Sequence, residues 1–429
     1  MLSGHHERCF RFRREIVLSA KETPISTLPS PRDLAQALKN RTGIFFSTGE
    51  VSGDLAGAGL AEAIRSKRPD IDLQGIGGSR MEKAGVSLLL NSNHLGAVGV
   101  SEPLHILPSF FKAFKTILDH VRRHPPRMAV LIGHEVFNVI LGRRLRDRGI
   151  FTVSYFPPQI WIWKSLARPI ARSYDLILTS FQEEDQVYRE TGVRTVFVGH
   201  YLRDMVDEPS RAKGDAARQS LGLPAEARVV GVFPGSRKQE VEGLAPVLLE
   251  GVKRLIGRDP SLKFVLPVAD PCLEPTVRRL VRHHGLEQRM VLGRNGHEAM
   301  TASDLLLLCS GTATLEAALL NRPMVVLYRV SLSTIRVARA AVRLGLMEPE
   351  TIALPNLLAG RTIVPELRQE QALASNLAEE AWRLLSNPDR QEIMRRELKS
   401  LKEQLGPKGA LERAAGEILG LYAPGRRSR

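Results

Sequence analysis

The stretch that sets the fold reads G-I-F-F-S-T-G-E-V-S-G-D-L-A-G and occupies residues 43–57. Its apolar start, residues 43–46, predicts a buried β-strand, and a helical pattern follows over residues 55–65. A glycine-containing turn joins the two. Because strand, turn and helix in this order are typical of the first unit of a parallel sheet, we expect an α/β protein.

Two series of such units follow along the chain. In the first, apolar runs occupy residues 128–132, 152–155, 176–178 and 195–198. In the second, they occupy residues 229–233, 263–267, 290–292 and 305–309. The polar stretch 204–228 predicts a connector between them. We therefore expect two doubly wound, Rossmann-like domains that face a shared cleft, with ligands at the carboxyl ends of their strands.

The expected boundaries divide the chain into four parts. A flexible leader covers residues 1–41, the first Rossmann-like domain residues 42–206, and the second residues 207–371. Residues 372–429 form closing helices, expected at 372–385, 390–404 and 410–421, and a basic tail.

Composition narrows the class of protein. With 43% apolar and 25% charged residues in 429, the chain is neither disordered, collagenous nor a coiled coil. Its three cysteines, Cys9, Cys272 and Cys309, lie far apart, which excludes a disulfide framework and a structural zinc site. No apolar run reaches the roughly 18 residues of a membrane-spanning helix, and no signal peptide precedes the domains, so we expect a cytoplasmic protein.

The net charge of +15 favours an anionic partner. Nucleic acid, an acidic membrane and a phosphorylated substrate all fit this charge. Because no nucleic-acid-binding motif accompanies it, we expect no nucleic-acid partner.

The turn P-G-S-R-K-Q-E, residues 234–240, follows the first strand of the second series. Gly235 allows a tight turn, while Ser236 and the backbone amides are placed to face an anion. Arg237 can hold a phosphate through two hydrogen bonds. The alternative is a plain strand-to-helix turn with a solvated arginine.

A second turn, S-G-T-A-T-L-E at residues 310–316, follows the strand 305–309. Gly311 permits close approach of a ligand, Thr312 and Thr314 offer hydroxyls and amides, and Glu316 can accept from ribose hydroxyls. A nucleotide diphosphate would fit between the two turns. The alternative is a threonine-capped helix with a solvated glutamate.

The first domain carries its polar residues in the opening turn. Glu50, Ser52, Gly53 and Asp54 follow a strand, where contacts with substrate hydroxyls are common. The competing interpretation is that Ser52 or Asp54 caps the following helix. The nearby G-I-G-G, residues 75–78, lacks the spacing of a dinucleotide fingerprint and is predicted to be a turn.

Residues 105–124 form a basic amphipathic helix. Its apolar side carries Phe110, Phe111, Phe114, Ile117, Leu118 and Val121. Such a stripe usually packs against a core. A phenylalanine-rich face flanked by lysines and arginines also suits an interfacial helix or an acyl-chain slot.

Together these motifs resemble those of the lipid-A-disaccharide synthase family, whose members are two-domain glycosyltransferases of the GT-B type. The resemblance spans residues 43–421. The motifs on which the resemblance rests are, in chain order, G-E-V-S-G-D, G-I-G-G-S-R-M, Y-F-P-P-Q-I-W-I-W, V-G-H-Y-L-R-D, P-G-S-R-K-Q-E, S-G-T-A-T-L-E-A-A-L-L, M-V-V-L-Y-R-V and L-P-N-L-L-A-G-R. The family transfers 2,3-diacylglucosamine from its UDP derivative to 2,3-diacylglucosamine 1-phosphate, with release of UDP and formation of a β-1,6 disaccharide.

The resemblance also implies roles for residues. Those that would hold the UDP-sugar are Ser236, Arg237, Glu240, Gly311, Thr312, Thr314, Glu316 and Asn356. On the acceptor side it places Glu50, Ser52, Gly53 and Asp54. It further implies inverting transfer without metal or other cofactor, peripheral attachment to the cytoplasmic face of the inner membrane, and a homodimer as one oligomeric state.

One departure from the family pattern affects catalysis. After the strand 128–132 the family reads I-D-x-P-D-F-N, and its first Asp is the usual general base, whereas this chain reads I-G-H-E-V-F-N. Gly133 therefore replaces the base. His134 and Glu135 are the nearby titratable candidates; the alternative is a base elsewhere. Lys164 and Tyr201 also depart from the pattern, which usually has Arg and Pro there.

Three other functions fit the same features. A divergent transferase could use a different acceptor, and a non-catalytic protein could bind a nucleotide-sugar or lipid. A UDP-sugar epimerase on the same scaffold would need a dense set of carboxylates in the cleft and no acyl pocket, which the Phe110 to Phe114 face argues against.

Overall fold

The computed structural model describes residues 41–91, 103–133, 135–158, 166–268, 270–329 and 352–422. Almost all of the predicted leader, the end of the basic tail, Cys9 and Lys164 lie outside these residues. The side chains of residues 103–109 and 135 are also not described.

In the described part of the chain, seven parallel strands form a sheet in the order β3-β2-β1-β4-β5-β6-β7. We call this sheet and its helices the first lobe. The strands are β1 (Ile44–Ser47), β2 (Leu73–Gly77), β3 (Ser87–Asn91), β4 (Met128–Ile132), β5 (Phe151–Tyr155), β6 (Leu176–Thr179) and β7 (Arg194–Phe197). The helices are α3 (Val51–Lys67), α4 (Ser79–Lys83), α5 (Pro103–Arg123), α6 (Glu135–Arg146), α7 (Ala167–Ala171) and α8 (Gln182–Arg189).

A second sheet, of six strands among the described residues, has the order β10-β9-β8-β11-β12-β13 and defines the second lobe. Its strands are β8 (Val229–Phe233), β9 (Lys263–Pro267), β10 (Met290–Gly293), β11 (Leu305–Cys309), β12 (Met324–Tyr328) and β13 (Glu366–Arg368). Its helices are α10 (Arg211–Ser220), α11 (Lys238–Arg258), α12 (Glu274–His283), α13 (Gly296–Ala302), α14 (Thr312–Leu319), α16 (Leu354–Ala359), α17 (Ala374–Leu385) and α18 (Pro388–Gln404), with 3-10 turns η3 (Pro271–Leu273) and η4 (Gln369–Gln371).

Both sheets place their first strand beside their fourth, so each has one point where the chain reverses its direction of winding. This is the doubly wound order, and it confirms the predicted fold class of two Rossmann-like units. The buried strands β4, β8 and β11 have the predicted bounds, because fully buried parallel strands are continuous apolar runs.

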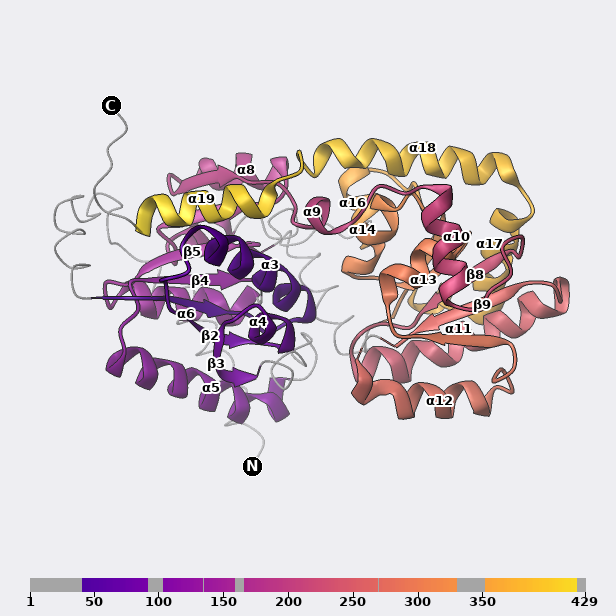
Figure 1. Cartoon of the computed structure of the whole chain (residues 1–429), viewed down its shortest axis with the longest axis horizontal. Helices are drawn as coiled ribbons and strands as arrows, with labels where there is room; N and C mark the ends of the chain where they lie inside the picture. Colours follow the sequence, from indigo (N-terminus) through magenta and orange to yellow (C-terminus); the bar gives the residue numbers. More distant parts are fainter. Residues whose placement is uncertain are drawn as a thin grey trace.

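The chain crosses between the lobes twice. The short helix α9 (Leu202–Met205) lies at the first crossing, and α18 runs along the second lobe before α19 (Ala410–Tyr422) returns to the first (Figure 1). The Asp204 carboxylate accepts the amide of Leu411 at 2.9 Å, and the Tyr422 hydroxyl accepts the amide of Gly43 at 3.1 Å. The last helix therefore belongs structurally to the lobe formed by the first half of the chain.

Two local predictions were wrong, and one strand was missed. Gly75, Ile76 and Gly77 lie in strand β2 rather than in a turn, and β3 was not anticipated. The segment predicted as a connector contains α10, which packs on the second lobe, and Arg218 pairs with Asp304 at 2.8 Å. Glycine-rich and highly charged segments carry little apolar signal, and here tertiary contacts decide their structure.

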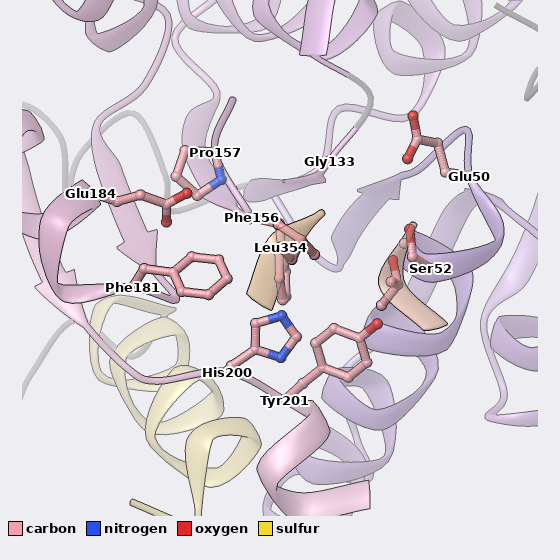
Figure 2. Close-up of a pocket in the computed structure, with 12 residues that line it drawn as sticks. Glu50, Ser52, Gly133, Phe156, Pro157, Phe181, Glu184, His200, Tyr201 and Leu354 are labelled. Carbon is pink, nitrogen blue, oxygen red and sulfur yellow. The ribbon is translucent and has the colours of Figure 1, made fainter. Parts of the chain in front are cut away.

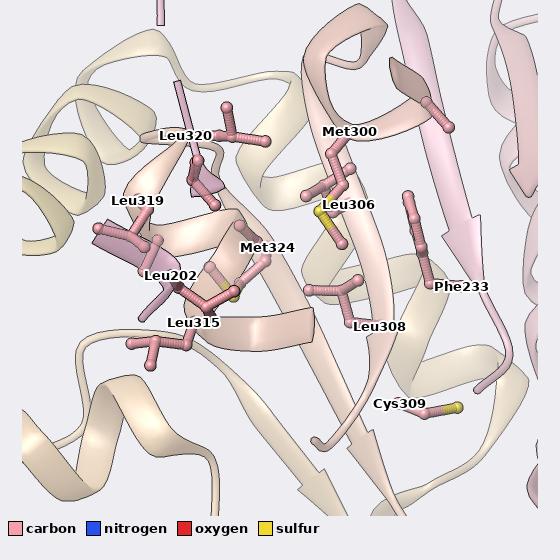
Figure 3. Close-up of a cluster of buried hydrophobic side chains, with 14 of the residues drawn as sticks. Leu202, Phe233, Met300, Leu306, Leu308, Cys309, Leu315, Leu319, Leu320 and Met324 are labelled. Carbon is pink, nitrogen blue, oxygen red and sulfur yellow. The ribbon is translucent and has the colours of Figure 1, made fainter. Parts of the chain in front are cut away.

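The apolar core of the second lobe extends to the segment that contains α9, where the chain first crosses between the lobes. Leu202 lies beside Leu315 and Leu319 of α14 in the buried apolar cluster (Figure 3). On the first lobe, α5 buries Ala113, Ile117 and Val121, so the core-packing interpretation of this helix holds for that face. No helix in the described segments combines the length and hydropathy needed to cross a bilayer.

Candidate functional site

A pocket of about 150 Å³ lies where the two lobes meet. Its walls come from the turns that follow β1, β4, β5 and β6, from the crossing segment, and from the starts of α14 and α16 (Figure 2). The residues that line it are Glu50, Ser52, Gly53, Gly133, Phe156, Pro157, Phe181, Glu184, His200, Tyr201, Thr312 and Leu354.

Each motif proposed from sequence follows a strand at a reversal point of its sheet. In the first lobe, Glu50 follows β1 and Gly133 follows the adjacent β4. In the second lobe, Arg237 follows β8 and Thr312 follows the adjacent β11. These reversal points are where doubly wound sheets bind ligands.

The two lobes are joined at this site by an ion pair. One guanidinium nitrogen of Arg237, Nη2, lies 3.5 Å from a Glu50 carboxylate oxygen, and the other, Nη1, lies 3.7 Å from one of Glu240. All three side chains are partly exposed, so these contacts stabilise the protein only modestly. An anionic ligand can therefore compete with both carboxylates for Arg237.

Glu240 has a structural role in its turn. Its Oε2 atom accepts the amides of Ser236 and Arg237 at 3.0 and 3.2 Å. The prediction that these two amides face a ligand is therefore wrong, because a carboxylate of the protein already occupies them. Gly235 has φ +110°, and a Cβ there would lie 2.5 Å from the same Oε2, so the turn requires glycine.

The turn before α14 is open to a ligand. Gly311 is the N-cap residue, and no side chain caps this helix. The alternative of a threonine-capped helix is therefore wrong. Thr314 is buried and its hydroxyl donates to the Gly311 carbonyl at 2.7 Å, whereas Thr312 lines the pocket. An uncapped helix start favours a negatively charged ligand through its free amides and its dipole.

Glu316 lies in α14, and its side chain is half-buried. Burial raises the pKa of its carboxyl to about 7, and the nearby Arg80 limits the rise. Near neutral pH the side chain can therefore either accept or donate a hydrogen bond.

We expect Glu316→Gln to stabilise the protein at pH 8 and to have little effect at pH 4. Burial raises the carboxyl pKa from 4.5 to about 7 in the folded protein. The folded state thus retains a proton that the unfolded state has lost, and the stability of the wild type falls as pH rises through this window. The difference in Tm between variant and wild type at the two pH values measures this; equal differences would contradict it.

The carboxylate of Asp54 is hydrogen-bonded within the protein. It accepts the amides of Gly78 at 2.7 Å, Met81 at 3.1 Å and Arg80 at 3.2 Å. It therefore holds the start of α4, and it does not line the pocket.

The predicted cap of the first helix is also wrong. Helix α3 begins at Val51, after Glu50, and no side chain caps it, so neither Ser52 nor Asp54 has that role. Ser52 remains in the pocket lining.

Asn356 is also structural. It is 0% exposed. Its Oδ1 accepts the amides of Ile363 and Val364 at 2.8 and 2.9 Å, and its Nδ2 donates to the Val364 carbonyl at 3.0 Å and to Glu366 at 3.2 Å. The expectation that it contacts the nucleotide-sugar is wrong, because all its hydrogen-bonding capacity closes the loop before β13.

The catalytic candidates follow β4. His134 lies outside the described residues, and Glu135 is the first residue of α6. Asn138 holds this turn against β1: its Nδ2 donates to the Gly133 carbonyl at 2.7 Å and its Oδ1 accepts from the Ser47 hydroxyl at 2.8 Å. Gly133 has φ +55°, and a Cβ there would meet no atom of the described residues within 4 Å.

The aromatic wall of the pocket was not identified from sequence as a site. Phe156, Phe181 and His200 come from three separate segments, and no spacing in the sequence connects them. Burial lowers the pKa of His200 to about 3. Its Nδ1 lies 3.2 Å from the Leu202 amide and accepts from it, so the ring is neutral with its proton on Nε2.

The arrangement can therefore bind an anionic ligand between the lobes. Arg237 and the uncapped start of α14 lie on the second-lobe side, and hydroxyl and carboxylate groups of the first lobe face them. Such a site can stabilise a departing diphosphate while an acceptor hydroxyl approaches from the first lobe.

Comparisons with known proteins agree on one family. The model of the family described as "Lipid-A-disaccharide synthetase" matches residues 44–415. The lipid-A-disaccharide synthase of Geobacter sulfurreducens is 37% identical over 377 residues, which is 88% of this chain and 96% of the relative. That of Myxococcus xanthus is 35% identical over 390 residues, 91% of this chain and 100% of the relative.

Among solved structures, a putative UDP-N-acetylglucosamine 2-epimerase from Listeria monocytogenes is similar with a TM-score of 0.60 and 13% identity. The similarity covers 91% of this chain and 98% of that one. At this identity it supports the two-lobed fold only.

Proposed function

Because this chain belongs to the lipid-A-disaccharide synthetase family, we propose that it joins UDP-2,3-diacylglucosamine to 2,3-diacylglucosamine 1-phosphate. The products are the β-1,6-linked lipid A disaccharide and UDP. The observation that carries this proposal is the match of residues 44–415, which spans both lobes and every element that lines the pocket. The enzyme is thus a disaccharide-forming glycosyltransferase.

In this reaction the acceptor 6-hydroxyl attacks the anomeric carbon C1 of the donor sugar. The bond from C1 to the diphosphate oxygen breaks, and UDP leaves with the bonding electron pair. The proton of the 6-hydroxyl passes to a base of the protein. We assign that role to the segment after β4, with Glu135 as the first candidate and His134 as the second.

We assign the donor to the second lobe. Arg237 would exchange its contacts with Glu50 and Glu240 for the diphosphate, and the uncapped start of α14 would supply further amides. Thr312 and Glu316 would complete this side, while Glu50, Ser52 and Gly53 would face the acceptor. Because arginine and helix amides can stabilise the leaving group, the transfer is proposed to need no metal and to invert the anomeric centre.

Product analysis tests the stereochemistry and the metal requirement. Nuclear magnetic resonance of the disaccharide is expected to show a β-linkage, and turnover is expected to be unchanged by an excess of chelator. An α-linkage would contradict inversion. Loss of turnover on chelation, with recovery on addition of Mg²⁺, would contradict metal independence.

We also propose that the first lobe contacts the membrane that holds both lipid substrates. Phe111 is 56% exposed, and it lies on α5 beside the exposed cations Lys112 and Lys115. Val51 and Val136 are exposed next to pocket residues. Apolar side chains flanked by cations suit an anionic lipid surface, and the net charge of +15 has the matching sign.

The variant Phe111→Ser is expected to weaken binding to anionic phospholipid vesicles about three- to tenfold in co-sedimentation. A fully buried phenylalanine contributes about 1.5 to 3 kcal/mol, and Phe111, which is partly covered by the protein already, can contribute about half of that. Ile393→Ser is the matched control, since Ile393 is 58% exposed on α18 of the second lobe. Equal loss in both variants, or none in Phe111→Ser, would contradict contact through α5.

Two further expectations, epimerase chemistry and a homodimer, have less support. The structural likeness to epimerases is at 13% identity, so it does not favour epimerase chemistry here. The homodimer stays a prediction from the resemblance.

A further inference from the structure

The hydroxyl of Tyr201 is buried and has no partner. The residue is 1% exposed, and its Oη atom makes no hydrogen bond with any described residue. The side chain lines the pocket, and its hydroxyl points to the side where Ser52 lies, away from Glu184 (Figure 2). A buried donor without an acceptor is costly, which suggests that a ligand supplies the acceptor.

Packing fixes this hydroxyl in place. The Tyr201 ring stacks on His200 with centroids 4.8 Å apart, and Phe156 meets it edge-on at 5.0 Å. Phe156 has φ +59°, a conformation that is strained for a phenylalanine and that this aromatic cluster maintains. On the other side, Leu202 is buried against α14 of the second lobe (Figure 3). The phenol is therefore held between the lobes before any ligand binds.

The surroundings of the hydroxyl favour an oxygen that carries negative charge. Helices α3 and α14 both begin at this pocket and have no side-chain cap, so their positive ends face it. After burial, the groups that influence the phenol are Glu316, which is partly protonated near neutral pH, then Tyr155 and Arg80. Burial raises the pKa of Tyr201 well above its usual value, so it remains a donor.

We propose that the Tyr201 hydroxyl donates a hydrogen bond to a β-phosphate oxygen of the UDP-sugar donor. The assignment rests on the proposed function and adds a residue to it. Tyr201 lines the same pocket as Thr312 of the nucleotide side and Ser52 of the acceptor side. The β-phosphate is the phosphate that bears the sugar, so it must lie at this junction when C1 meets the acceptor. The hydroxyl thereby stabilises UDP as the C1–oxygen bond breaks.

The test compares the affinities of the whole protein for UDP and UMP by calorimetry. Tyr201→Phe keeps the ring and removes the hydroxyl, and it is expected to raise the Kd for UDP about 10- to 100-fold while the Kd for UMP changes less than about twofold. Tyr155→Phe is the matched control. Its hydroxyl is equally buried and without a partner among the described residues, but it does not line the pocket, and UDP affinity is expected to be unchanged.

Several results would overturn the assignment. An unchanged Kd for UDP in Tyr201→Phe would do so, as would equal losses for UDP and UMP or an equal loss in Tyr155→Phe. A raised KM for the acceptor with unchanged UDP affinity would place the hydroxyl on the acceptor phosphate instead. Failure of the wild type to bind UDP would contradict the proposed function itself, and is thus distinguishable from these outcomes.

Discussion

Glu135→Gln is expected to lower kcat about 10²- to 10⁴-fold with little change in UDP affinity. This is the range by which a positioned general base accelerates a reaction. Glutamine keeps the size of the side chain but cannot take up the acceptor proton. Glu135 begins α6 two residues after Gly133, which lines the pocket, so the change alters proton transfer while the donor site in the second lobe is preserved.

A paired variant makes this prediction sharper. Adding Gly133→Asp to Glu135→Gln is expected to restore at least about tenfold of the lost turnover. A Cβ at residue 133 meets no atom of the described residues within 4 Å, and aspartate tolerates its φ of +55° better than most residues. His134→Asn is tested in parallel. Unchanged turnover in Glu135→Gln would exclude Glu135 as the base, and a large loss in His134→Asn would assign the role to His134.

Arg237→Ala is expected to raise the Kd for UDP about 10- to 100-fold. The guanidinium contacts carboxylates of both lobes, so a phosphate that replaces them gains a charged partner at the junction of the lobes. Hydrogen bonds from a cation to phosphate are worth about 1.5 to 3 kcal/mol. Calorimetric titration with UDP measures the change.

The neighbouring Lys238→Ala provides the control for charge. Lys238 is exposed, and its ammonium lies 3.9 Å from Glu242 rather than at the ion pair between the lobes. It is expected to change UDP affinity less than about threefold. If both variants lost affinity equally, the effect of Arg237 would be one of general charge and the proposed phosphate contact would be wrong.

The fold could be predicted largely from apolar runs. Strands such as β4 and β11 are buried on both faces, so their sequences are continuous blocks of apolar residues. Strand β2 was missed because three of its five residues, in L-Q-G-I-G, are polar or glycine. Helix α10 was missed because its sequence is mostly polar and only Ala217 is buried.

The site could be predicted only in part. Glu50, Gly133, Arg237 and Thr312 lie after adjacent strands, as expected, because strand ends at reversal points lie together in this fold. Asp54, Glu240 and Asn356 were assigned to ligands, but their polar atoms bind backbone amides of the protein itself. Sequence spacing does not distinguish a side chain that closes a turn from one that binds a ligand, since the same polar residue types do both.

Tyr201 illustrates the opposite case. In sequence it is only a departure from a family pattern. Its burial, its contact with Phe156 and the pocket that it shares with Thr312 depend on segments far apart in the chain, and these become visible only when the two lobes are assembled.

The most direct test of the account is disaccharide formation by the purified chain. The protein is incubated with UDP-2,3-diacylglucosamine and 2,3-diacylglucosamine 1-phosphate, and both the disaccharide and UDP are quantified in the same tube. The account predicts equal amounts of the two products, and no UDP release without acceptor. Tight binding of the UDP-sugar with no disaccharide would contradict it, because the chain would then bind the donor without catalysing this transfer.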